Sequence, residues 1–168
     1  AINKRLPVRR VESKRWRPPE SPLVKINYDG SFQSHTKRSC TRIVVRNSNG
    51  FVLGSSTTIY NNIPSVFATE ALACFQAVEM GIGLGFLDAK IEGGALTVVK
   101  HNANKQDGSL ISAYIMDSKS ISTNYRICIF LHAQKQGNGV AHLLATECIR
   151  TGETTYLLEE VCNLPNPT

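Results

Sequence analysis

The sequence has no apolar run that approaches the length of a membrane span, and its basic N-terminus has no apolar signal core. We therefore expect neither insertion into a membrane nor secretion. It also has no CxxC pair, because its five cysteines are widely spaced, at positions 40, 74, 128, 148 and 162. We interpret them as reduced thiols of an intracellular protein, in the nucleus or in the cytoplasm. Internal repeats are absent as well.

The net charge of the chain is concentrated at one end. Residues 1–19 contain seven of the 19 Lys and Arg residues and one of the 13 Asp and Glu residues, so that this segment carries the whole formal charge of +6. Such an arm can bind nucleic acid through phosphate contacts or act as a nuclear address. It can equally be a solvated leader from a longer precursor.

The remaining composition is typical of one globular domain. The chain has 168 residues, of which 42% are hydrophobic and 19% charged. The segment "WRPPESP" is a proline-rich hinge, so we expect ordered pairing to begin only after Pro22. We predict a basic, flexible arm at 1–19, a folded domain at 20–150 and a peripheral tail at 151–168.

Alternating and helical periodicities predict the order of elements in the folded domain. Two β-branched runs joined by Asn49-Gly50 predict a hairpin, and Ser65 is the expected N-cap of a helix that ends at Ile82. The order βββαβααβα predicts an α/β fold whose mixed sheet has three antiparallel strands followed by two parallel ones. The predicted strands are 23–28, 41–46, 51–58, 88–92 and 126–132, and the predicted helices are 65–82, 95–103, 109–120 and 138–149.

Two carboxylates stand where chemistry is expected. Asp29 directly follows the first apolar strand, and Glu70 lies in the first turns of the long helix among small residues. Carboxylates from a strand and an adjacent helix can hold Mg²⁺ through oxygen ligands. The alternatives are that Asp29 belongs to an ordinary Asp-Gly turn and that Glu70 only complements the helix dipole. Tyr28, the last residue of the first predicted strand, is expected to be a core or sheet-face residue.

Five motifs in order resemble one family. The motifs are "KINYDGSF", "IVVRNSNGFVLG", "ATEALACFQAVEMGIGLGF", "IEGGALTVV" and "FLHAQKQGNGVAHLLA", spread from about Trp16 to Arg150. They resemble the plant ribonuclease H-like domain of non-LTR retroelement reverse transcriptases and of stand-alone proteins. The resemblance implies a ribonuclease H-like fold with a five-stranded mixed sheet flanked by helices. It further implies hydrolysis of RNA in RNA–DNA hybrids with Mg²⁺ or Mn²⁺. We also expect a monomer that derives from a larger retroelement polyprotein.

The resemblance also assigns roles to individual residues. Asp29 and Glu70 match metal ligands of the family. His132 matches a mobile histidine that assists water activation or product release, and His142 falls where related enzymes have a fourth acid. The third aspartate of the family belongs to an E-x-D-(S/A)-L-x-V-(V/I) motif, and its position here is Gly94. The resemblance thus implies a metal site that lacks one carboxylate.

Four further residues bear on how this site works. Arg42 stands where the family usually has glycine or another small residue, and it either meets phosphate or blocks a close approach. With Lys135 and Asn138 it is a predicted contact to nucleic acid. Glu92 would share the face of position 94 on a regular strand, which leaves partial replacement open although it is recessed. Two functions follow: an endoribonuclease of hybrids, or a catalytically silent module that binds hybrid or RNA.

Overall fold

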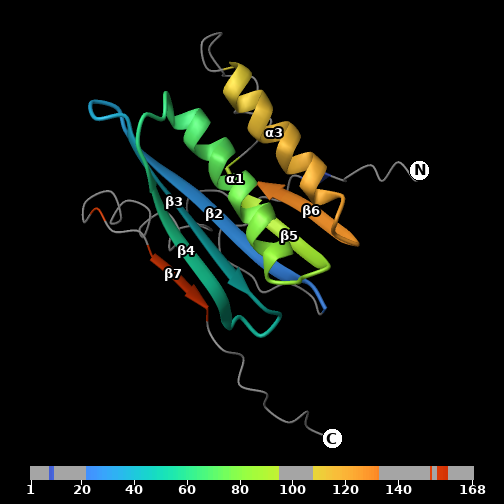
Figure 1. Cartoon of the computed structure of the whole chain (residues 1–168). Helices are drawn as coiled ribbons and strands as arrows, with labels where there is room; N and C mark the ends of the chain where they lie inside the picture. The colour runs from blue at the N-terminus through green and yellow to red at the C-terminus, as the bar shows by residue number, and fades with distance from the viewer. Residues whose placement is uncertain (1–7, 10–21, 95–107, 133–151, 153–154, 159–168) are drawn as a thin grey trace, which may run out of the picture.

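The computed structural model of the chain describes residues 8–9, 22–94, 108–132, 152 and 155–158 (Figure 1). These residues form one seven-stranded sheet in the order β1-β6-β5-β2-β3-β4-β7, together with helices α1 and α3. The strands are β1 (Val8–Arg9), β2 (Val24–Gln33), β3 (Arg38–Arg46), β4 (Val52–Tyr60), β5 (Asp88–Gly93), β6 (Ile127–His132) and β7 (Thr155–Leu158).

The five central strands have the predicted mixed topology. β2, β3 and β4 pair in antiparallel fashion, and β5 and β6 add on the other side of β2 in parallel. The turn between β3 and β4 is the predicted hairpin: Gly50 has a φ of 81°, and the Asn47 side chain accepts hydrogen bonds from the backbone N–H groups of Asn49 and Phe51. The ribonuclease H-like fold expected from the resemblance is thus confirmed.

Helix α1 (Val66–Gly83) begins where the sequence predicts. The Ser65 hydroxyl accepts a hydrogen bond from the N–H of Ala68 at 3.1 Å, as an N-cap does. By length and composition alone α1 could cross a membrane, but ten of its residues are buried in the fold. Its apolar composition is therefore explained by its place against the sheet.

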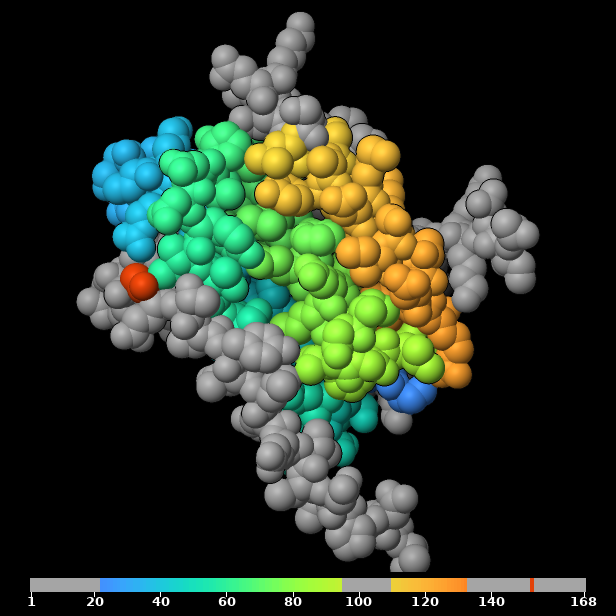
Figure 2. All heavy atoms as spheres, viewed as in Figure 1, coloured from blue at the N-terminus to red at the C-terminus, as the bar shows by residue number. Residues whose placement is uncertain are grey.

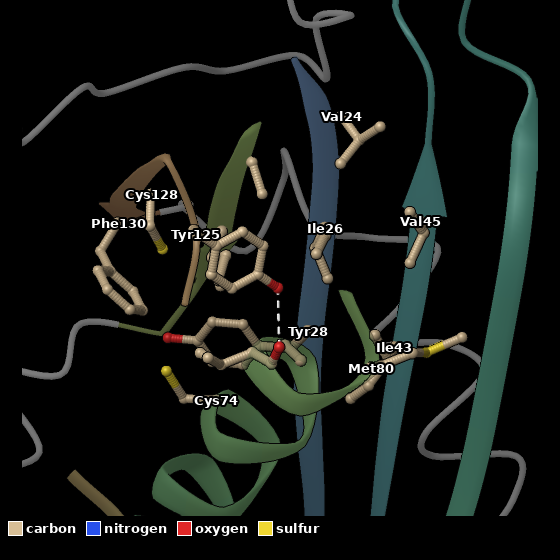
Figure 3. Packing of buried hydrophobic residues seen from close by; sticks show 14 of the residues in the cluster. Val24, Ile26, Tyr28, Ile43, Val45, Cys74, Met80, Tyr125, Cys128 and Phe130 are labelled. Carbon is tan, nitrogen blue, oxygen red and sulfur yellow. Dashed lines mark hydrogen bonds between the residues drawn. The ribbon is translucent and has the colours of Figure 1, made fainter. Parts of the chain in front are cut away.

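The two described helices cover one face of the sheet. Figure 1 shows α1 and α3 (Gly108–Ser122) side by side in front of the strands, and Figure 2 shows their side chains forming a continuous surface. The main core lies between α1 and the sheet, where Tyr28, Ile43 and Tyr125 contribute large buried side chains (Figure 3). A second cluster lies around α1 and α3; its buried members are Ile63, Ala68, Ala71, Leu72, Ile111 and Ile115.

Two expectations are corrected. Val8–Arg9 pairs in parallel with β6, so pairing does not begin only after Pro22; the open edge of β6 offers unpaired backbone groups that an extended segment can satisfy. Cys40 is disulfide-bonded, so the interpretation of all five cysteines as reduced was wrong for this one. The predicted helices 95–103 and 138–149 lie outside the described residues, and the limits 1–19, 20–150 and 151–168 stay predictions.

Candidate metal and nucleic-acid site

Asp29 and Glu70 come from elements that approach each other closely. Asp29 lies in β2 and is 9% exposed. Its neighbour Gly30 meets Thr69, the residue before Glu70, so closely that a Cβ on Gly30 would lie 2.6 Å from Thr69 Cγ2. Only glycine permits this approach of strand and helix. The packing therefore brings the strand carboxylate and the helix carboxylate to the same region.

Position 94 faces the carboxylate of Glu70. A Cβ built on Gly94 would lie 2.6 Å from Glu70 Oε2 and 3.2 Å from its Cδ. Gly94 directly follows β5, so a side chain at this position would project from the end of a central strand toward the helix. The place that the motif assigns to a third carboxylate thus lies against the second one.

Tyr28 connects these elements, a role that the sequence did not indicate. Its hydroxyl donates a hydrogen bond to the carbonyl oxygen of Gly94 at 2.8 Å, and its ring packs where a Cβ on Gly93 would stand. Burial raises the pKa of Tyr28 well above its usual value, and Cys74, Glu70 and Asp29 raise it further. Figure 3 shows that hydroxyl directed toward Cys74.

The oxygen donors present suit one hard divalent cation better than two. Mg²⁺ is commonly held by one or two carboxylates with water completing the octahedron, which Asp29 and Glu70 can provide. Within the described ranges, no group of three His, Cys, Asp or Glu residues could hold a metal ion. The Gly94 carbonyl is already engaged by Tyr28. A pair of ions about 3.5–4 Å apart needs bridging charge that position 94 does not supply.

Glu92 is committed to a different interaction. It forms a buried ion pair with Lys25, and the two side chains are 3% and 6% exposed. Glu92 pairs with Asn27 across β5 and β2, so it shares a face of the sheet with Asp29 but lies nearer to Lys25 along the strand. The Glu92 carboxylate is thus held by Lys25. This argues against the possibility that Glu92 substitutes for the carboxylate that position 94 lacks.

Arg42 lies on the sheet directly opposite Asp29. The two residues are register partners in the β2–β3 ladder, and each is 9% exposed. The Arg42 Nη1 group donates to the Thr57 hydroxyl on β4, and burial lowers the pKa of the guanidinium. Its contact with phosphate stays a prediction, and in the folded chain little of the side chain is open to solvent.

His132 ends β6 beside the end of β5. It is the register partner of Gly93, and its Nδ1 atom is buried with no hydrogen-bond partner in the structure as described. The topology therefore places His132 at the same sheet edge as Gly94. The other predicted site residues, Lys135, Asn138 and His142, lie outside the described residues.

Solved structures with the same arrangement of strands and helices are ribonucleases H, so the fold is ribonuclease H-like. The chain resembles ribonuclease H1 from Halobacterium salinarum (16% identity, TM-score 0.67, covering 77% of this chain and 98% of that one). It also resembles the N-terminal ribonuclease H domain of a Mycobacterium tuberculosis protein (17% identity, TM-score 0.64, covering 77% of this chain and 94% of that one). A third similar structure is the ribonuclease H1 LC11, in complex with an RNA/DNA hybrid (14% identity, TM-score 0.61, covering 77% of this chain and 98% of that one). At these identities the likeness shows the fold alone.

A family model settles the membership. The reverse transcriptase-like family model matches residues 27–148, which is more than half of the chain, and the chain belongs to this family. None of the curated proteins compared with the chain matches it.

Proposed function

We propose that the chain is a ribonuclease H-type domain that binds RNA–DNA hybrids and that its hydrolytic site is weakened by the missing carboxylate at position 94. The observation that carries this proposal is the closeness of position 94 to Glu70 Oε2, 2.6 Å from a Cβ built there. The hydrogen bond from Tyr28 to the Gly94 carbonyl, which ties β2 to position 94, supports this layout of a carboxylate site that lacks one charge.

In this proposal Asp29 and Glu70 hold Mg²⁺ or Mn²⁺. A cation bound there would supply positive charge and a water of lowered pKa next to the scissile phosphate. His132 accepts or returns a proton through Nδ1, the buried nitrogen without a hydrogen-bond partner among the described residues. His142 belongs to the same site on the strength of the sequence motif alone. Because each 1.36 kcal/mol of lost transition-state stabilisation is about tenfold in rate, the loss of one carboxylate reduces cleavage severely.

Binding of the hybrid is proposed to depend on positive charge outside the metal site. The arm at 1–19 carries the net charge of +6, and Lys135 and Asn138 follow β6 in the chain. Phosphate contacts of this kind release counterions, so we expect affinity to fall steeply with salt. One structure of the same fold contains an RNA/DNA hybrid, which supports this class of ligand. A monomer, an origin in a larger retroelement polyprotein and an intracellular location complete the proposal.

The Gly94→Asp variant tests the proposal, with Gly94→Asn as a control of equal size and no charge. Only the far end of the Glu70 side chain lies close to the new Cβ, so it can move aside. We expect Gly94→Asp to raise Mg²⁺-dependent cleavage of a labelled hybrid at least about 100-fold, with no gain for Gly94→Asn. Equal cleavage by the unmodified chain, Gly94→Asp and Gly94→Asn would refute the proposal that the site lacks a carboxylate at position 94. Salt-dependent binding without cleavage in any chain would instead support a silent binding module.

A further inference from the structure

We propose that Tyr28 is a positioning residue of this site: its hydroxyl and its ring together hold the backbone of residues 93 and 94, so that a group at position 94 stands against Glu70. The inference rests on the proposed function, since it concerns how the same site is arranged. It predicts that a carboxylate introduced at position 94 works fully only while the Tyr28 hydroxyl is present.

The end of β5 depends on Tyr28 because the strand ladders stop just before position 94. The described ladder with β2 ends at Glu92, and the ladder with β6 ends at Gly93. The Tyr28 hydroxyl donates its hydrogen bond, of 2.8 Å, to the carbonyl of the next residue, Gly94. Among the described contacts, position 94 is thus held by a side chain and not by a register partner.

The ring of Tyr28 fixes the preceding residue. A Cβ built on Gly93 would overlap three carbon atoms of the ring, so the ring lies directly on the backbone there. Tyr28 is 2% exposed, and close packing of the core leaves the ring little room to move away. One side chain therefore contacts two consecutive residues, which fixes both the place and the orientation of the chain at this point.

The same hydroxyl also reaches the helix that carries Glu70. It is in hydrogen-bond contact with the Cys74 thiol, which lies one helical turn after Glu70 on α1 (Figure 3). Burial raises the pKa of Cys74 to about 12, so this thiol is protonated at neutral pH and can donate to the hydroxyl oxygen, while the hydroxyl donates to Gly94. These contacts thus connect the helical turn that carries Glu70 to the end of β5.

Close positioning matters because position 94 faces Glu70 at short range. A Cβ there would lie 2.6 Å from Glu70 Oε2, so a small displacement of the strand end changes whether carboxylates at both positions can bind one cation. Catalytic groups must be held within about 0.5 Å of the productive geometry, and a misplacement of about 1 Å can cost about 100-fold in rate. Loss of the Tyr28 hydroxyl should therefore reduce what a carboxylate at position 94 contributes.

Tyr28→Phe in the Gly94→Asp chain tests the inference, because it keeps the ring on Gly93 and removes only the hydroxyl. The matched control is Tyr125→Phe, which removes a hydroxyl that donates to the Val78 carbonyl at 2.7 Å in the same core. We expect Tyr28→Phe to lower kcat for Mg²⁺-dependent hybrid cleavage at least about tenfold with KM within about twofold, whereas Tyr125→Phe changes kcat less than about threefold. Mn²⁺ affinity, titrated through the electron paramagnetic resonance signal of the free ion, should fall in parallel with kcat.

A second readout needs neither catalysis nor metal. Gly94-Ala95 is the only Gly-Ala peptide in the sequence, so labelling of glycine carbonyls with ¹³C and of alanine amides with ¹⁵N gives one correlated nuclear magnetic resonance signal from the Gly94 carbonyl. With glycine kept at position 94, Tyr28→Phe should shift this ¹³C signal upfield, because a carbonyl that loses a hydrogen bond becomes more shielded. Tyr125→Phe should leave the signal in place.

The outcomes separate this inference from the proposed function. An unmoved Gly94 signal in Tyr28→Phe, or equal effects of Tyr28→Phe and Tyr125→Phe on kcat, would overturn the inference, and a cleavage gain by Gly94→Asp would then still support the proposed function. If Gly94→Asp gains no cleavage, the proposed function fails, and a Gly94 signal that moves only in Tyr28→Phe supports the hold on position 94. Far-UV circular dichroism verifies folding. Should Tyr28→Phe not fold, Gly93→Ala displaces the ring instead and is expected to lower kcat of the Gly94→Asp chain likewise; an unchanged kcat would overturn the inference.

Discussion

Removing one partner of the buried Lys25–Glu92 ion pair should strongly destabilise the fold. The two side chains are 6% and 3% exposed, so the charge that remains after its partner is replaced would stay inside the protein. Breaking a buried pair in this way costs about 3–5 kcal/mol, whereas replacing both partners is often nearly neutral. We therefore expect Glu92→Gln or Lys25→Met to lower the free energy of unfolding by about 3 kcal/mol each. The double variant should lose clearly less than the sum.

Urea denaturation followed by circular dichroism measures these changes. With a slope of about 1–3 kcal/mol per molar urea, a loss of 3 kcal/mol moves the midpoint by about 1 M or more. The double-mutant cycle then gives a coupling energy of about 2 kcal/mol or more. A cost below about 1 kcal/mol for Glu92→Gln, or additive losses, would refute the reasoning. A fall in Mn²⁺ affinity with unchanged stability would instead identify Glu92 as a metal ligand.

Two further predictions concern the packing of α1 on the sheet. Gly30→Ala should lower the free energy of unfolding by about 1–3 kcal/mol, because its Cβ would meet the fully buried Thr69 at 2.6 Å. Gly83→Ala is the control in the same urea assay, since a Cβ at that position meets nothing within 4 Å. Equal effects of the two substitutions would contradict the close approach of Gly30 and Thr69. Burial raises the pKa of Cys74 and of Cys128 to about 12, so at pH 8 iodoacetamide should modify both thiols at least about 100-fold more slowly than a free thiol until the chain unfolds. Mass spectrometry follows this labelling, and rapid modification of either thiol in the folded protein would be inconsistent with that burial.

The local elements were predictable from the sequence because each depends on neighbouring residues. The turn at Asn49-Gly50 and the cap at Ser65 follow from backbone preferences and short-range hydrogen bonds, and the structure confirms both. The motif around Gly94 located the end of β5, since that signal is also contained in a few consecutive residues.

The long-range contacts of the site were not predictable in this way. Tyr28 was expected to be no more than a core or sheet-face residue, because its hydrogen bond to Gly94 joins positions 66 residues apart. The ion pair of Glu92 with Lys25 depends on the register of two parallel strands, which a crossover sets and no local pattern encodes. The same holds for the pairing of Val8–Arg9 with β6, which depends on an edge that forms only in the folded sheet.

The central claim is that this chain retains a ribonuclease H-type site that lacks one carboxylate. The ratio of Mg²⁺-dependent hybrid cleavage by Gly94→Asp to that by Gly94→Asn tests it most directly, because the two variants differ in one charge at the position that faces Glu70. We predict a ratio of about 100 or more, abolished when Asp29→Asn is added to Gly94→Asp. A ratio near one, with both variants folded and both binding the hybrid, would contradict the account.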